Sequence, residues 1–131
     1  MTDSVLVAYI RKAVPGLVAL YRFGSTTRDE VRPESDIDLA FLSREALSEL
    51  YRFELAQDMA TQFHRDIDLV DLHFASTVLR MQILSTGTCL TAEDEGARRV
   101  FEMYAYSDYA RLNEERREIL KGITKRGLVY G

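Results

Sequence analysis

The stretch Gly24–Leu39 reads GSTTRDEVRPESDIDL and separates two apolar segments of the chain. The segment before it, residues 17–23, reads LVALYRF and stops at the glycine, and residues 37–42 form the second segment. Short apolar runs that end at a glycine or at a polar loop are typical of buried β-strands. The sequence therefore predicts two strands joined by a polar loop.

Two carboxylates stand at the start of the second predicted strand, at Asp36 and Asp38. Alternate residues of a strand point to the same face, so we expect the two side chains to lie side by side near the Gly24-Ser25 corner. Carboxylates held this close repel each other unless a cation lies between them. Mg²⁺ is commonly shared between one or two carboxylates and the phosphates of a substrate. The pattern therefore indicates phosphoryl or nucleotidyl transfer.

The loop also supplies groups that can bind phosphate. A glycine at position 24 allows close approach of the backbone, and Ser25 offers a hydroxyl and an N–H group. Arg28 and Arg32 add positive charge to the same loop. We therefore expect Gly24, Ser25, Arg28 and Arg32 to contact the phosphates of a nucleotide.

The pattern Gly-Ser, ten residues, Asp-x-Asp resembles the signature of the nucleotidyltransferases that share the DNA polymerase β fold. The surrounding residues, Arg32-Pro33 and Ser35–Leu39, resemble the minimal nucleotidyltransferase (MNT) branch. This resemblance implies an α/β chain of the α+β type, with a small mixed sheet flanked by helices and a long C-terminal helix. It also implies ATP as substrate and Mg²⁺, two ions being expected, bound by the carboxylates.

A third carboxylate is expected on the next strand, where residues 66–72 read DIDLVDL. Asp66 and Asp68 share one face of this strand, and Asp71 lies on the other, as a strand-end cap or a surface group. The resemblance to MNT proteins, in which this segment reads much the same, places the third ligand at Asp68. Asp66 remains the alternative, because it faces the same way.

The rest of the chain alternates helical and extended patterns. Pro15-Gly16 ends a first helix, and Gly87 ends a later one. The pattern predicts helices from the Thr2–Ser4 region to Val14, from a cap at Ser43 to about His64, from Ser76 or Thr77 to Gly87, and over 93–122, with a short edge strand at 88–90 and a frayed tail from Lys125.

The predicted C-terminal helix carries apolar and aromatic residues on several sides. Two interpretations remain open: these residues pack on the sheet of the same domain, or some of them form a surface for a partner. His64 and His73 flank the third strand, where a structural role is more common for histidine than metal ligation.

Length and composition limit the function classes. The 131 residues suit a single nucleotidyltransferase domain over residues 1–131. A net charge of −4 provides no basic footprint for nucleic acid. Cys89 has no partner for an internal disulfide, which fits a reducing cytoplasm, and we expect it to be a small core residue. No apolar run approaches the length of a membrane span, and Arg11-Lys12 follow the first apolar residues, unlike in a signal peptide.

The resemblance implies a biological role as well as a chemistry. Many MNT proteins are antitoxins encoded beside a HEPN-domain ribonuclease toxin, and some transfer AMP from ATP to a tyrosine of that toxin. This implies a protein hydroxyl as acceptor here. The alternative is an antitoxin that neutralises its toxin by contact alone, without catalysis. Transfer to a small molecule is less favoured, because drug-modifying relatives carry an additional helical domain.

Overall fold

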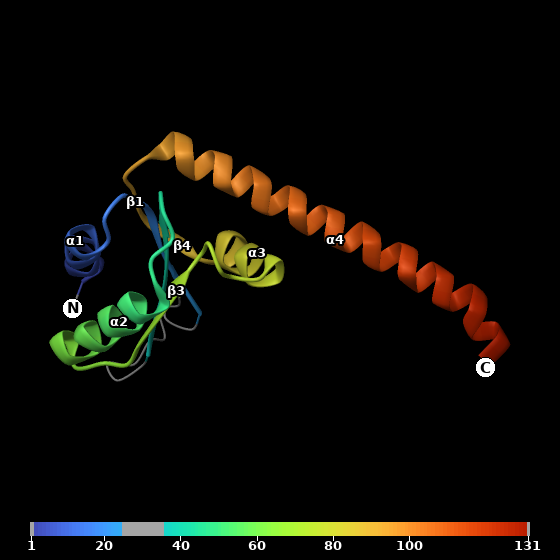
Figure 1. Ribbon diagram of the computed structural model, residues 1–131, viewed down its shortest axis with the longest axis horizontal. Coiled ribbons are helices and arrows are strands. Elements are labelled where there is room, and N and C mark those ends of the chain that lie inside the picture. Colours follow the sequence, from blue (N-terminus) through green and yellow to red (C-terminus); the bar gives the residue numbers. More distant parts are fainter. Residues whose placement is uncertain (1, 25–35, 131) are drawn as a thin grey trace.

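The structure, a computed structural model, describes residues 2–24 and 36–130, apart from the side chains beyond residue 123. Four strands and four helices follow one another along the described chain (Figure 1). Their bounds are α1 (Asp3–Ala13), β1 (Leu17–Phe23), β2 (Ile37–Ser43), α2 (Glu49–Phe63), β3 (Ile67–Asp71), α3 (Thr77–Thr86), β4 (Thr88–Ala92) and α4 (Glu95–Tyr130). Among these residues, no helix is both long and apolar enough to cross a membrane.

The strands form one mixed sheet in the order β3-β2-β1-β4. β1 pairs antiparallel with both β2 and β4, whereas β2 and β3 run parallel. A parallel pair needs a crossover connection, and α2 provides it. The predicted mixed sheet with flanking helices and a long C-terminal helix is therefore confirmed.

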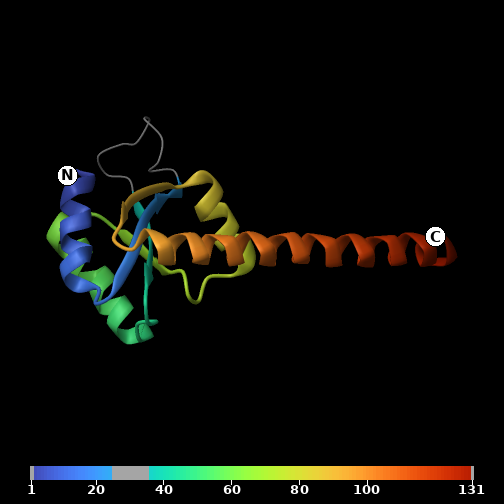
Figure 2. The same cartoon turned by 90° about the horizontal axis from the view of Figure 1, so that it is seen from above.

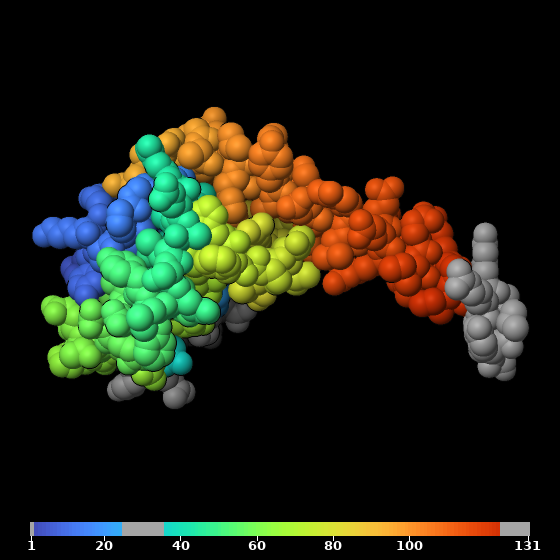
Figure 3. Space-filling view, viewed as in Figure 1, coloured from blue at the N-terminus to red at the C-terminus, as the bar shows by residue number. Residues whose placement is uncertain are grey.

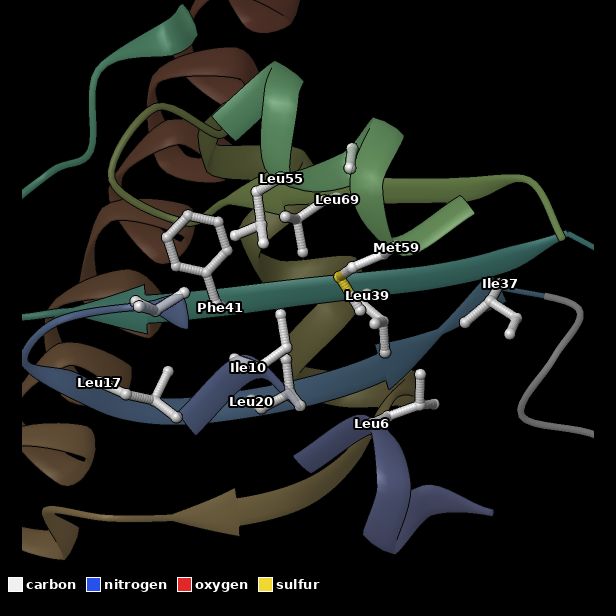
Figure 4. Close-up of a cluster of buried hydrophobic side chains, with 12 residues drawn as sticks. Leu6, Ile10, Leu17, Leu20, Ile37, Leu39, Phe41, Leu55, Met59 and Leu69 are labelled. Atoms are coloured by element: carbon white, nitrogen blue, oxygen red, sulfur yellow. The ribbon is translucent and has the colours of Figure 1, made fainter. Parts of the chain in front are cut away.

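One face of the sheet is covered by α1 and α2. Its core combines Leu6 and Ile10 of α1 with Met59 of α2 and the strand residues Leu20 and Phe41, all fully buried. Figure 4 shows these side chains directed toward one another from the two helices and the sheet. The two helices α1 and α2 therefore bury this face of the sheet.

The other face is covered by α3 and the first turns of α4. Tyr21, Ala40 and Leu72 pack there with Ile83 of α3, and Phe101 of α4 packs against them. Because helices cover both faces, β1 and β2 are almost continuously apolar and do not alternate with polar residues.

The predicted start of α2 at Ser43 is wrong. Ser43 is still paired with Leu17 in the β1–β2 ladder, so its backbone cannot also begin a helix. Its buried hydroxyl donates to the carbonyl oxygen of Glu45 at 2.5 Å. The helix is capped by Ser48, whose side chain accepts the N–H of Tyr51 at 3.1 Å.

The predicted end of the last helix at Gly122 and the frayed tail are also wrong, because α4 continues to Tyr130. A glycine inside a helix costs about 1 kcal/mol relative to alanine, which is not enough to end a long helix. The second half of α4 extends beyond α3 and the sheet (Figures 1 and 2). In the space-filling view this part of the helix stands clear of the body of the molecule (Figure 3).

Gly87 lies where α3 meets β1, and it provides a test of this packing. A Cβ at Gly87 would lie 2.5 Å from the Ile83 carbonyl oxygen and 3.0 Å from that of Arg22, both rigid backbone atoms. We therefore expect Gly87→Ala to lower the free energy of unfolding by about 1–3 kcal/mol. Urea denaturation followed by circular dichroism measures this.

The matched control is Gly96→Ala, where the nearest atom to an added Cβ is an Asp94 carboxylate oxygen at 3.7 Å. This variant should be as stable as the wild type or slightly more stable. A Gly87→Ala protein with wild-type stability would show that β1 and α3 approach less closely than described.

Candidate active site

Three strand ends meet at one end of the sheet. Phe23, the last residue of β1, is paired with Asp38 of β2, and Asp38 is in turn paired with Asp68 of β3. The Gly24 corner therefore follows β1 next to Asp38, with Asp68 on the next strand. Residues far apart in the sequence are brought to one place by strand pairing alone.

Asp38 and Asp68 project from the same face of the sheet, the face covered by α3. Asp38 lies two residues before Ala40, and Asp68 lies two residues before Val70, and both of these apolar residues belong to the core on that face. Asp36 lies two residues before Asp38 and is exposed. Asp38 and Asp68 thus share one face of the sheet, as predicted, and Asp36 lies near enough to Asp38 for their charges to interact.

The carboxylates interact electrostatically. Partial burial raises the pKa of Asp38 above its usual value, and the nearby charges of Asp68 and Asp36 raise it further. Asp66 is not among the groups that raise it. Asp66 precedes β3, where its carbonyl oxygen accepts the N–H of Ile37 at 2.9 Å. Asp68 is therefore the better placed of the two candidates for a shared site with Asp38.

Gly24 lies in contact with the Asp38 carboxylate. Its φ of +73° is in the left-handed region, which favours glycine. A Cβ at this position would lie 2.2 Å from Oδ2 of Asp38. The glycine is thus required for both its backbone conformation and its space, and it allows the corner to lie against the carboxylate.

Ser25, Arg28 and Arg32 lie outside the described residues, so their expected contacts with phosphate remain predictions.

The donor set suits a hard cation, but the described residues do not form a complete cage. Within residues 2–24 and 36–130, no three His, Cys, Asp or Glu side chains are close enough to hold a metal ion by themselves. Mg²⁺ usually takes only one or two carboxylates and fills its octahedron with water and substrate phosphates. The geometry therefore fits an ion that is bound together with a nucleotide.

The other polar candidates have structural contacts. Asp71 is 4% exposed and accepts the N–H groups of His73 at 2.9 Å and Leu47 at 3.4 Å, which confirms its prediction as a strand-end cap. Nε2 of His73 lies 2.6 Å from the Ser43 carbonyl oxygen, and His64 ends α2 with a φ of 55°. The Cys89 thiol is partly buried beside the core, and burial raises its pKa.

The sequence did not reveal a cavity of about 490 Å³ along the outer edge of β3. Asp68 lines it, together with Arg52 at the start of α2 and Phe74 and Leu79 near the start of α3. A single phenylalanine after a strand carries no periodic pattern, so no signal in the sequence distinguishes Phe74 from a core residue. The cavity thus begins at a residue of the carboxylate cluster.

Comparisons with known proteins agree with this geometry. The family described as "Polymerase beta, Nucleotidyltransferase" matches residues 6–96. The protein adenylyltransferase MntA of Shewanella oneidensis is 34% identical over 125 residues, which cover 94% of this chain and 88% of the relative.

Solved structures of toxin–antitoxin complexes contain similar chains. One complex, solved with AMP-PNP, has a chain that is 34% identical, with a TM-score of 0.81 and coverage of 95% of this chain and 99% of that chain. In another, a tri-AMPylated Shewanella oneidensis HEPN toxin is in complex with an MNT antitoxin. The matching chain is 33% identical, with a TM-score of 0.76 and coverage of 93% of this chain and 95% of that chain.

The family match covers more than half of the chain, and it includes the strands that carry Gly24, Asp38 and Asp68. The similarity to MntA, at 34% identity, extends over 94% of this chain. The chain therefore belongs to the polymerase β-type nucleotidyltransferases, in the minimal nucleotidyltransferase branch that includes MntA.

Proposed function

We propose that this protein is the antitoxin of a HEPN/MNT pair and transfers AMP from ATP to a hydroxyl, most simply a tyrosine, of the HEPN ribonuclease toxin. The observation that carries the proposal is the cluster of Asp36, Asp38 and Asp68 beside the Gly24 corner. The relatives support it, because one is named a protein adenylyltransferase and another was solved with an AMPylated toxin.

In this proposal the three carboxylates would hold Mg²⁺, with two ions expected, which would supply positive charge next to the phosphates. The Gly24 backbone holds the β- and γ-phosphates, together with Ser25, Arg28 and Arg32. The tyrosine oxygen attacks the α-phosphorus while the bond to the bridging oxygen breaks, and pyrophosphate leaves. Asp68 orients the tyrosine hydroxyl and accepts its proton.

The proposal also covers the organisation and setting of the protein. Residues 1–131 act as one nucleotidyltransferase domain, in the cytoplasm where ATP is available. The net charge of −4 argues against direct binding of nucleic acid.

The exposed side of α4 favours contact with a partner. Phe101 is partly buried and Ala105 is fully buried against the domain, but Ile119 and Ile123 are 61% and 57% exposed. At 3.6 residues per turn, these four residues and Leu112 lie within an arc of about 40°. One apolar stripe therefore packs on the domain in its first half and has no cover within the described residues in its second half. The first half of the helix therefore packs on its own domain, and in this proposal the exposed second half contacts the partner.

This exposed stripe is also compatible with the alternative function, in which the antitoxin acts by direct binding and catalysis is not required. The two mechanisms differ in what they need from the carboxylates. Catalysis requires them, whereas neutralisation by contact does not.

Charge-neutral variants test the catalytic role and the choice of third ligand. Asp38→Asn and Asp68→Asn should each reduce transfer of labelled AMP to the purified HEPN protein by at least about a hundredfold, because metal-assisted charge stabilisation contributes several kcal/mol. Asp66→Asn is the matched control and should retain most activity. Complex formation, measured by size-exclusion chromatography, should be unchanged.

A loss of activity with Asp66→Asn and not with Asp68→Asn would assign the third carboxylate to the alternative position. Full neutralisation of the toxin by both Asp38→Asn and Asp68→Asn would favour the contact mechanism.

Asp38→Asn should also stabilise the metal-free protein, because it removes a partly buried charge that Asp36 and Asp68 repel. Because the folded-state pKa of Asp38 is raised, the contribution of this group to the free energy of unfolding is most favourable at acid pH. That contribution is lost as the pH rises and Asp38 ionises. The gain in melting temperature should therefore be largest near pH 7 and disappear at acid pH. Asp58→Asn, at an exposed position of α2, should show no such gain. A lower melting temperature of Asp38→Asn at pH 7 would contradict the described repulsion.

The uncovered part of α4 is tested by Ile119→Asp combined with Ile123→Asp. We expect at least a tenfold weaker complex with the HEPN protein in calorimetry, because each isoleucine buried at an interface contributes about 1.5–3 kcal/mol. Val5→Asp introduces the same charge at an apolar residue of α1 that is 45% exposed and should not change affinity. Equal affinity of all three proteins would exclude the stripe from the interface.

A further inference from the structure

The outer edge of β3 lies at the side of the sheet, where a cavity follows it. β3 is a terminal strand of the sheet, and Figure 1 shows it between α2 and α3. The cavity of about 490 Å³ follows this edge, with the start of α2 on one side and the start of α3 on the other. We call this cavity the β3-edge groove, and Asp68 lies at its end nearest the carboxylate cluster.

The floor of the β3-edge groove is held by internal hydrogen bonds. Nη1 of Arg52 donates to the Leu69 carbonyl oxygen at 2.9 Å, so this edge carbonyl is satisfied by a side chain of α2. The buried carboxylate of Asp71 accepts two backbone N–H groups. The groove is therefore preformed.

The rim of the groove is apolar and open. Phe74 lines the groove with 72% of its surface exposed. Val70 and Leu79, also lining residues, are only partly buried. An aromatic ring this exposed at the mouth of a cavity is typical of a contact surface for another molecule.

The geometry of the reaction indicates which molecule. In phosphoryl transfer the attacking and leaving oxygens lie roughly in line on opposite sides of the phosphorus. The Gly24 corner lies at the end of β1, Asp38 lies on the middle strand, and Asp68 lies on β3. With pyrophosphate on the β1 side, the acceptor hydroxyl must approach from the β3 side, where the groove opens.

We propose that the β3-edge groove binds the segment of the protein acceptor that carries the modified hydroxyl. The inference rests on the proposed function and names the acceptor-binding surface of the same site. β3 has five residues, which span about 16 Å and provide room for four or five extended residues of the partner. The hydroxyl-bearing residue lies at Asp68, and an apolar residue of the partner packs on Phe74.

A variant of the groove should change the kinetics for the protein acceptor and not those for ATP. Phe74 contacts the acceptor and neither ATP nor the reacting atoms, so its loss should affect acceptor binding alone. Phe74→Ala should raise the KM for the purified HEPN protein about tenfold, in line with the burial of one phenylalanine. The kcat and the dissociation constant for an ATP analogue should be unchanged. The melting temperature should also be unchanged, because the ring is exposed.

Phe53→Ala provides the matched control, because Phe53 is an α2 residue that is 55% exposed and does not line the groove. It should show wild-type kinetics. An unchanged KM for Phe74→Ala, or an equal increase for Phe53→Ala, would overturn the groove while leaving the proposed function intact. A higher dissociation constant for the ATP analogue with Phe74→Ala would assign the groove to the nucleotide and overturn the inference. Absence of AMP transfer by the wild-type protein would overturn the proposed function and the groove together.

Discussion

The parallel pairing of β2 with β3 is the constraint on which the site depends. It places Asp38 opposite Asp68, 30 residues later in the chain, although no local sequence feature connects them. The pairing needs a crossover, and α2 meets this need while its residues Leu55 and Met59 fill the core below the sheet. The position of the third carboxylate is therefore a consequence of how α2 packs.

The site places mutually repelling carboxylates at the end of a well-packed sheet. The largely buried strand β2 and the edge strand β3 carry carboxylates whose mutual repulsion opposes folding in the absence of a cation. Gly24 tolerates this arrangement because it has no side chain to occupy the space taken by the Asp38 carboxylate. A fold of this kind gives up some stability in order to hold a charge pattern that a metal–nucleotide complex can complete.

Much of this could be predicted from the sequence, because apolar runs and their breaks report burial directly. The positions of β1, β2 and β3 follow from such runs, and so does the place of Asp38 near the start of β2. The start of α2 could not be predicted, because both Ser43 and Ser48 are suitable caps and only pairing with Leu17 excludes the first. The β3-edge groove is formed by residues from α2, β3 and α3, and so it has no signature within any one segment.

We propose that Asp36, Asp38 and Asp68 jointly hold a divalent cation against a nucleoside triphosphate at the Gly24 corner. A crystal grown with Mn²⁺ and a non-hydrolysable ATP analogue tests it most directly, because manganese can be located by anomalous scattering. The account predicts anomalous density in contact with carboxylate oxygens from both β2 and β3 and with the phosphates, next to Gly24. Nucleotide bound with its metal away from these three side chains would contradict it.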